Sequence, residues 1–113
     1  MLDYISENLS VSQLIEASIN GCPKMQQTLY TRFASKMYKA CLRYTNNNTD
    51  DAKDVLQDGF VQVFKNLHKF RNEGSFEGWI RTIITRTALS QIREKNKKVT
   101  SYNTDVLHAS ERY

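Results

Sequence analysis

The segment from residue 69 to residue 79 brings together the side chains with which proteins hold an unpaired nucleobase. Aromatic rings provide surfaces on which a base stacks, amides and hydroxyls bond to base edges, and cations attract phosphate. The rings are Phe70, Phe76 and Trp79, the short polar groups are Asn72 and Ser75, and the cations are Lys69 and Arg71. Aromatic residues serve mostly in packing, so the alternative is that the three rings close the end of a pair of helices. The composition of the segment leaves both interpretations open.

Catalytic and metal-binding chemistry is poorly supported elsewhere in the chain. The two histidines, His68 and His108, are isolated, and neither lies near a nucleophile motif. Four aspartates cluster in the sequence without a histidine or cysteine at ligand spacing, and they miss the twelve-residue calcium-loop pattern. These aspartates are Asp50, Asp51, Asp54 and Asp58. We expect a protein that is not an enzyme and that needs no metal or cofactor.

Length and composition are those of one globular domain. The chain has 113 residues, of which 40% are hydrophobic and 25% are charged, as in ordinary soluble domains. No run approaches the roughly 20 apolar residues of a membrane span, and the N-terminus lacks the pattern of a secretory signal. Cys22 and Cys41 lack CxxC spacing, which favours reduced, buried thiols over a disulfide or a metal site. We therefore expect a cytoplasmic protein without a membrane partner.

Positive charge is concentrated in the second half of the chain. Residues 1–60 carry six basic and seven acidic residues, a net charge of −1, whereas residues 61–113 carry ten and five, a net charge of +5. Within residues 65–98 the count is nine basic against three acidic. This asymmetry favours an anionic partner that docks on one side of the domain. The alternative is a solvated lysine-rich surface.

Hydrophobic periodicity predicts four helices and no strand. The expected ranges are Val11–Asn20, about 23–45, from Thr49 or Asp50 to about His68, and from Ser75 to Lys97. Ser10 or Ser12 is placed to cap the first helix, Gly21 to end it, and Pro23 to begin the second. We expect residues 1–10 to form a frayed arm. Periodicity is lost after residue 98, so residues 99–113 are predicted to form a linker or tail.

Each helix has one apolar face, and the three longer helices are predicted to share one core. The faces are Leu14, Ile15 and Ile19 in the first helix; Leu29 or Tyr30, Phe33, Ala34, Met37, Tyr38, Cys41, Leu42 and Tyr44 in the second; Ala52, Val55, Leu56, Gly59, Phe60, Val63, Phe64 and Leu67 in the third; and Trp79, Ile80, Ile83, Ile84, Thr87, Ala88 and Ile92 in the fourth. The fold class is therefore all-α, a small three- to four-helix bundle that occupies residues 1–98.

The outer faces of the last two helices differ in charge. Asp54, Gln57 and Asp58 lie on one side of the third helix, and this acidic and amide strip suits an arginine-rich partner helix. The alternative is that these residues only solvate an exposed helix face. The fourth helix carries Arg86 and Arg93 seven residues apart. Together with the aromatic loop it would form a cationic groove for single-stranded or opened DNA.

Three motifs in order resemble region 2 of bacterial sigma factors of the extracytoplasmic-function (ECF) type. They are Asp51–Phe60 (DAKDVLQDGF), Phe70–Phe76 (FRNEGSF) and Trp79–Ile83 (WIRTI). The family patterns are roughly D-A-x-D-x-x-Q-[DE]-x-F, F-R-x-[DE]-x-x-F and W-[LI]-x-x-I. Each motif has low specificity alone, but three in order at the right spacing are strong, and the resemblance covers about residues 10–98.

The resemblance implies a domain that acts in transcription initiation without chemistry of its own. The outer face of the third helix would bind the clamp helices of the largest (beta prime) subunit of RNA polymerase core. The loop and the fourth helix would capture a base flipped from the non-template strand of the promoter minus-ten element and help to melt it. The implied polymerase-binding residues are Asp54, Gln57, Asp58, Val61 and Gln62. The implied DNA-binding residues are Asn66, Lys69, Phe70, Arg71, Asn72, Ser75, Phe76, Trp79, Thr82, Ile83, Arg86, Ser90 and Arg93, with Asn66, Phe70 and Ile83 placed to wall the base pocket.

Two positions depart from the family pattern. Arg86 stands where the family usually has Asn, which leaves the preferred minus-ten base open and favours phosphate or guanine. Ser90 stands where the family often has Asp, which removes a negative charge that would face DNA. Full members also carry a second helical domain, region 4, which reads the minus-35 element, so we expect this chain to be a fragment of a longer protein.

Two alternatives stay open. One is a protein-interaction module that binds polymerase or an anti-sigma factor without contacting DNA. The other is a general helical nucleic-acid-binding domain without sequence preference. Salt-dependent binding to single-stranded DNA separates the nucleic-acid interpretations from the interaction module.

Overall fold

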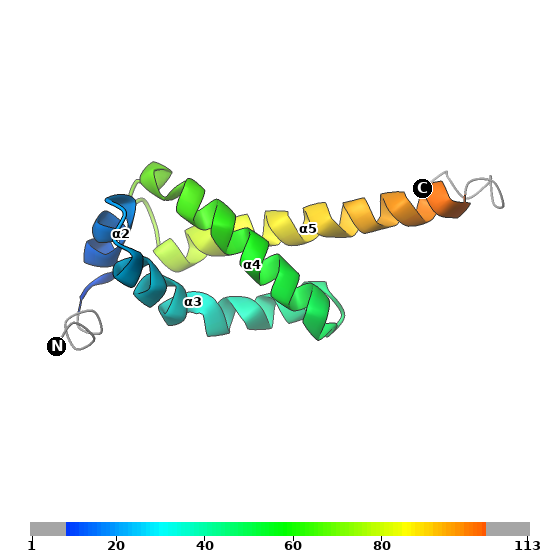
Figure 1. Cartoon of the computed structure of the whole chain (residues 1–113), viewed down its shortest axis with the longest axis horizontal. Helices are drawn as coiled ribbons and strands as arrows, with labels where there is room; N and C mark the ends of the chain where they lie inside the picture. The colour runs from blue at the N-terminus through cyan, green and yellow to red at the C-terminus, as the bar shows by residue number, and fades with distance from the viewer. Residues whose placement is uncertain (1–8, 104–113) are drawn as a thin grey trace.

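Four α-helices and one short 3-10 helix make up residues 9–103, the part of the chain that this computed structural model describes. They are α2 (Val11–Ile19), α3 (Pro23–Tyr44), α4 (Thr49–Lys65), η1 (Leu67–Lys69) and α5 (Phe76–Asn103), and this stretch has no strand (Figure 1). Side chains are described as far as Lys97. The all-α prediction is confirmed. Most of the predicted N-terminal arm, and His108, lie outside the described residues.

The sequence signals around α2 act as predicted. Ser10 caps the helix, and its hydroxyl accepts from the backbone N–H of Gln13 while the Gln13 side chain accepts from the Ser10 N–H. This reciprocal pair is a capping box. Gly21 takes a φ of +88° and donates its N–H to the carbonyl of Ser18, which ends the helix. Pro23 then begins α3, where no helical N–H is lost.

The turn between α3 and α4 is built from asparagines. Asn46 and Asn47 both have positive φ, 53° and 64°, a conformation that asparagine tolerates better than most residues. Asn48 caps α4 by accepting a hydrogen bond from the N–H of Asp51 at 3.0 Å. The helix therefore begins at Thr49, the first of the two expected positions.

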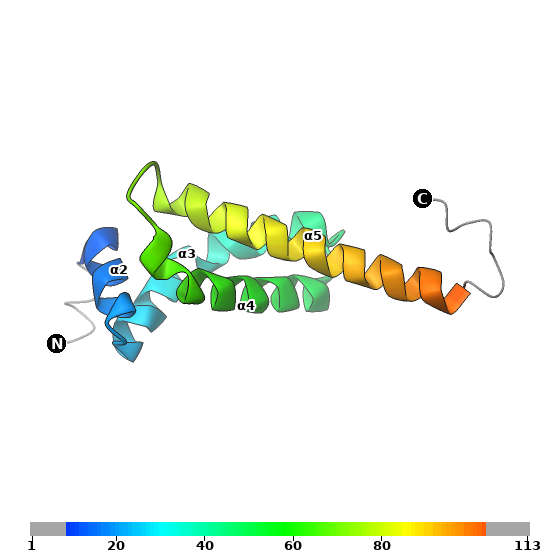
Figure 2. The same ribbon diagram turned by 90° about the horizontal axis from the view of Figure 1, so that it is seen from above.

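The core lies among α3, α4 and α5, and α2 packs against α3 and η1 at one end (Figure 1). All but Phe64 of the predicted apolar face of the third helix are buried, and Phe64 packs at the margin of the core. Figure 2 shows α5 running alongside α4 and projecting beyond the other helices. The largest fully buried side chains are Leu14, Leu29, Met37, Leu67, Ile80, Ile84, Val55, Val63 and Cys41.

Two residues assigned to apolar faces are exposed instead. Ile19 lies in the last turn of the nine-residue α2 and is 48% exposed, because Leu14 and Ile15 already make the contact of this short helix with the core. Tyr44 ends α3, and its hydroxyl accepts a hydrogen bond from Thr85 of α5 at 3.3 Å. Both predictions were wrong because these residues lie in the last turns of their helices, where neighbouring elements cover them only in part.

The last helix is longer than its apolar pattern predicts. Periodicity indicates an end near Lys97, yet α5 continues to Asn103, five residues into the predicted linker 99–113. The rest of that segment lies outside the described residues, and its role as a linker stays a prediction. No helix in the described part of the chain is both long and apolar enough to cross a membrane.

Both cysteines are free thiols. Cys41 is fully buried, as predicted, and burial raises the pKa of its thiol to about 11. It therefore stays protonated and unreactive at neutral pH. Cys22, at the junction of α2 and α3, is only half-buried.

Gly59 lies where α4 packs closely on Ile84 of α5, and its substitution tests that contact. A Cβ built on Gly59 would overlap Cδ1 of the fully buried Ile84. We expect Gly59→Ala to lower the free energy of unfolding by about 1 kcal/mol, since overpacking costs about 1–3 kcal/mol and the gain in helix propensity is about 1 kcal/mol. Chemical denaturation measures the change.

Ile84→Val is the matched control, because it removes only the Cδ1 atom that a methyl group at residue 59 would meet. The Gly59→Ala substitution is expected to cost less in the Ile84→Val background than in the wild type. Equal stabilisation of both backgrounds by Gly59→Ala would show that the helices do not meet as closely as described.

Candidate functional site

A groove of about 670 Å³ separates α4 and η1 from α5. It brings together six of the predicted DNA-binding residues and three of the predicted polymerase-binding residues. The lining residues are Asp58, Val61, Gln62, Asn66 and Lys69 on one side, and Trp79, Ile83, Arg86, Thr87, Ser90 and Gln91 on the other. Thr87 and Gln91 were not predicted as site residues. Their spacing of four and eight from Ile83 is the signal that places them on the same side of α5.

Antiparallel pairing of α4 with α5 sets the order of residues along the groove. The amide of Gln91 donates to the carboxylate of Asp58 at 2.6 Å, and Lys95 pairs with Asp51 further along the two helices, also at 2.6 Å. Asp58 and Gln91 therefore lie at one end of the groove, and Lys69 of η1 lies at the other. The acidic end and the basic end of the groove are thus distinct.

The rings of the loop pack against one another. The centroid of Phe76 lies 5.2 Å from that of Phe70 and 5.7 Å from that of Trp79, and Phe70 and Trp79 are 5.4 Å apart. Phe33 of α3 adds an edge-to-face contact with Phe76 at 5.4 Å. Phe76 is buried, as the packing interpretation expects. Phe70, one of the three residues expected to wall the base pocket, does not line the groove, because its ring is taken up by this cluster.

Trp79 is the one member of the ring cluster that also lines the groove. It is half-buried, so part of its indole packs on Phe70 and Phe76 and part remains accessible. With Ile83 one turn later it gives the groove an apolar wall. Stacking of a base requires such a wall, and the other two rings hold it in place.

The remaining predicted residues of the loop are exposed but lie outside the groove. Arg71, Asn72 and Ser75 are exposed around a sharp turn, in which Asn72 and Gly74 have φ values of 59° and 88°. The Ser75 hydroxyl accepts from the N–H of Gly78 at 2.9 Å. Ser75 therefore caps the first turn of α5, and its oxygen already accepts this hydrogen bond.

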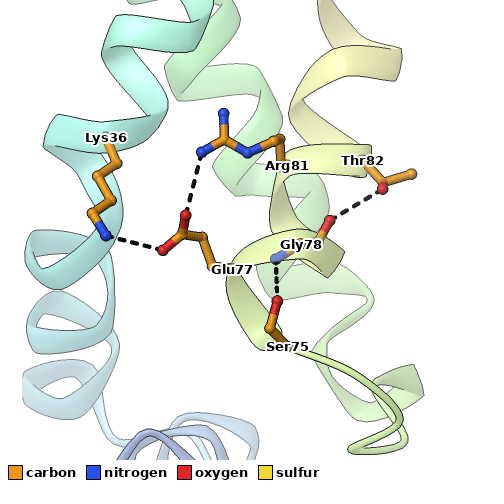
Figure 3. A network of polar contacts seen from close by, with 6 residues as sticks. All are labelled: Lys36, Ser75, Glu77, Gly78, Arg81 and Thr82. Carbon is orange, nitrogen blue, oxygen red and sulfur yellow. Dashed lines mark hydrogen bonds and ion pairs between the residues drawn. The ribbon is translucent and has the colours of Figure 1, made fainter.

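Glu77 ties the first turn of α5 to α3 (Figure 3). Its carboxylate accepts from Lys36 Nζ at 3.1 Å and from Arg81 at 3.3 Å. The hydrogen bond from Lys36, then that from Arg81, and the charges of both lower the pKa of the Glu77 carboxyl below its usual 4.5. Such exposed pairs add little stability, but this one joins the first turn of α5, just before Trp79, to α3.

Thr82 and Arg93 do not line the groove. The Thr82 hydroxyl donates to the carbonyl of Gly78 at 3.1 Å (Figure 3). Thr82 also lines a smaller hollow of about 320 Å³ with Gly78, Arg81, Thr85 and Arg86. Arg86 therefore borders both hollows, whereas Arg93 is exposed and borders neither.

The predicted polymerase-binding residues occupy one exposed face of α4. Val61 is 47% exposed and borders two hollows, the groove beside α5 and a second one beside α3. Gln57 lines the hollow beside α3, and Asp58 lines the groove. Asp54 is exposed and lines neither. Val61 is therefore an exposed apolar side chain flanked by acids and amides. Among the side chains that the structure describes, those of residues 9–97, no group of three histidine, cysteine or acidic residues is placed to hold a metal ion.

A family model described as sigma-70 region 2 matches residues 29–98, more than half of the chain. A protein named ECF RNA polymerase sigma-E factor from Haemophilus influenzae is 27% identical over 94 residues, which are 83% of this chain and 49% of that protein. Proteins of the same name from Salmonella typhimurium and Escherichia coli are 27% identical over 105 residues, 93% of this chain and 54% of theirs. The chain thus spans about half the length of the curated relatives it matches.

Proposed function

The chain belongs to the sigma-70 region 2 family and resembles its ECF type, and we propose that it is the part of an RNA polymerase sigma factor that engages both core polymerase and opened promoter DNA. The relatives carry the name of RNA polymerase sigma factors. The structural observation that carries the proposal is the groove between α4 and α5, in which an apolar wall and two cations meet.

In this proposal the groove receives a base flipped from the non-template strand of the minus-ten element. Trp79 and Ile83 supply the wall against which the base stacks, and Lys69 and Arg86 attract the flanking phosphates. Unstacking a base costs a few kcal/mol. Stacking on an aromatic side chain contributes about 1–3 kcal/mol per base. This offsets much of the cost of unstacking, so the groove can hold a melted strand without any covalent step.

Asn66 presents a polar atom to the base. Its side-chain amide nitrogen donates to the carbonyl of Gln62 at 2.8 Å. The amide oxygen of Asn66, which lines the groove, is therefore available as an acceptor for a donor on the base edge.

The exposed face of α4 is proposed as the surface that docks on the beta prime clamp helices. Val61 offers an apolar contact, and Asp54 and Asp58 offer charges to arginines of a partner helix. Such a centre of exposed apolar surface with a charged rim is typical of protein interfaces. The same face would be available to an anti-sigma factor.

The second candidate is an interaction module that binds polymerase or an anti-sigma factor without contacting DNA. Closure of the Phe70 and Phe76 rings on each other favours it, because those rings are not free to stack on a base. The two candidates differ in what they predict for single-stranded DNA.

Binding to single-stranded DNA tests the groove. We expect the chain to bind a mixed-sequence single-stranded oligonucleotide more weakly as salt rises, and Lys69→Ala to reduce the magnitude of the slope of log K against log salt by about 0.7, the value for one phosphate contact on a single strand. Fluorescence anisotropy at several salt concentrations measures both quantities.

Arg43→Ala is the matched control, because Arg43 is an exposed cation at the end of α3, which contributes no residue to the groove. Its affinity and slope are expected to equal those of the wild type. An equal decrease in affinity and in slope for both variants would show that DNA is attracted diffusely to the positive surface and not to the groove. No binding by the wild type would favour the interaction module.

Charge reversal at Asp58 tests the docking face. We expect Asp58→Arg to lose capture by core polymerase, because it would place a cation opposite the arginines of the partner, while its thermal unfolding stays close to that of the wild type. Pull-down with purified core polymerase and circular dichroism measure the two properties.

Gln91→Ala removes the hydrogen bond that Asp58 accepts and leaves the charge of α4 unchanged. Core polymerase is expected to capture the Gln91→Ala variant normally. The comparison therefore separates the effect of losing the hydrogen bond from the effect of losing the carboxylate. Normal capture of the Asp58→Arg variant would remove this face of α4 from the proposal.

A further inference from the structure

Two exposed faces of the chain are complementary in charge, and each includes an exposed apolar side chain. Val61 of α4 is 47% exposed, and Leu89 of α5 is 44% exposed. Exposed apolar surface that is rimmed by polar residues is typical of interaction sites. The residues around Val61 and Leu89 indicate the partner that each face suits.

The face around Val61 is acidic. Asp58 precedes Val61 by one turn and Asp54 precedes it by two turns, and both aspartates are exposed. Oδ2 of Asp58 accepts a hydrogen bond from Gln91, which leaves Oδ1 for another donor. The basic residue nearest to Val61 on this side of α4 is Lys65, one turn further on in the last turn of the helix. Asp54, Asp58 and Val61 are called the acidic face below.

The face around Leu89 is basic. Arg86 precedes Leu89 by three residues and Arg93 follows it by four, so these three side chains form one row along α5. Both arginines are exposed, and no hydrogen bond or ion pair joins either to another residue whose side chain is described. Neither acidic residue of α5, Glu77 or Glu94, belongs to the row. Arg86, Leu89 and Arg93 are called the basic face below.

The two faces match in spacing as well as in charge. If Val61 of one copy of the chain packs on Leu89 of another, Asp58 lies about 4.5 Å along the helix axis from that contact. An arginine lies about one turn from Leu89 in each direction. Asp58 therefore meets an arginine whether the two helices run parallel or antiparallel, and the apolar contact and the ion pair form together.

We propose that the acidic face of one copy of the chain docks on the basic face of a second copy. A second copy accounts for both faces at once. Single-stranded DNA would account only for the basic face, because phosphates are repelled by Asp54 and Asp58 and make no use of the exposed Leu89. Contacts between exposed charges are weak and screened by salt, so the association is expected at high protein concentration and low salt.

Self-association would cover residues that the proposed function uses. Asp58 and Val61 belong to the face proposed to dock on polymerase, and Arg86 lines the groove. A copy held in this way is therefore withheld from polymerase and from DNA. This consequence rests on the function proposed above, whereas the association itself needs neither partner, so the two proposals fail separately.

Sedimentation equilibrium of the 113-residue chain, at several protein concentrations and at low and high salt, tests the association. We expect the average mass to rise above that of one chain as the protein concentration increases, and to rise less at high salt. The mass of one chain at every concentration would overturn the proposal. That is the result expected if DNA or polymerase alone occupies these faces.

Two charge-reversed variants identify the faces. Asp54→Arg with Asp58→Arg makes the acidic face basic, and Arg86→Glu with Arg93→Glu makes the basic face acidic. Each variant alone is expected to associate about tenfold or more weakly than the wild type, because like charges then face each other. An equal mixture of the two is expected to regain association, since each reversed face finds its opposite. A mixture that stays at the mass of one chain would overturn the assignment of the faces.

Lys39→Glu with Arg43→Glu is the matched control. It makes the same change in net charge as the Arg86 and Arg93 substitutions, on exposed cations of α3 that belong to neither face. This control is expected to associate as the wild type does, and an equal loss would show that net charge governs the association and not the two faces. Circular dichroism checks that each variant keeps the fold, and the salt dependence of the wild type needs no variant.

Discussion

The close contact of α4 with α5 at Gly59 and Ile84 is the constraint on which the rest of the site depends. Both residues are buried, and a side chain at residue 59 would overlap Ile84. Their chain neighbours, Asp58 and Ile83, line the groove. The distance between the two helices at this contact therefore sets the separation of the two walls. A residue that forced the helices apart would alter stability and the shape of the groove together.

The aromatic cluster of the loop serves packing and the site through different members. Phe76 is buried among Phe33, Phe70 and Trp79 and anchors the start of α5 in the core. Trp79 shares that contact and still lines the groove. A side chain that meets a ligand benefits from being held in one orientation, because less conformational entropy is lost on binding. Glu77 also restrains this part of the chain, because its hydrogen bond from Lys36 ties the first turn of α5 to α3.

The fold followed from sequence because its signals are local. The Ser10 cap, the Gly21 stop, the start of a helix at Pro23 and the apolar faces of α4 and α5 all correspond to structure. The errors lie where an apolar pattern is a poor guide to structure. Ile19 has an apolar side chain that the core leaves exposed, and α5 continues past its apolar pattern where it projects beyond the other helices.

The site was harder to predict than the fold, because residue type does not reveal which way a side chain is used. The resemblance implied Phe70 as a wall of the base pocket, but its ring packs against other rings. Ser75 offered a hydroxyl to a base, but that oxygen caps α5. Three of the residues that the resemblance implies, Asn66, Ile83 and Arg86, line the groove from its two sides. The partnership of Gln91 with Asp58 depends on the packing of α4 against α5, and no local pattern contains it.

Trp79 is the only tryptophan in the chain, so tryptophan emission reports on one wall of the groove. Titration of the chain with single-stranded DNA, followed by tryptophan fluorescence and by anisotropy of a labelled oligonucleotide in parallel, tests whether a base enters there. Stacking of a base on the indole predicts quenching of Trp79 that saturates with the same dissociation constant as the anisotropy change. If an oligonucleotide binds by anisotropy but leaves the emission of Trp79 unchanged, the proposal that a base stacks on Trp79 in the groove is contradicted.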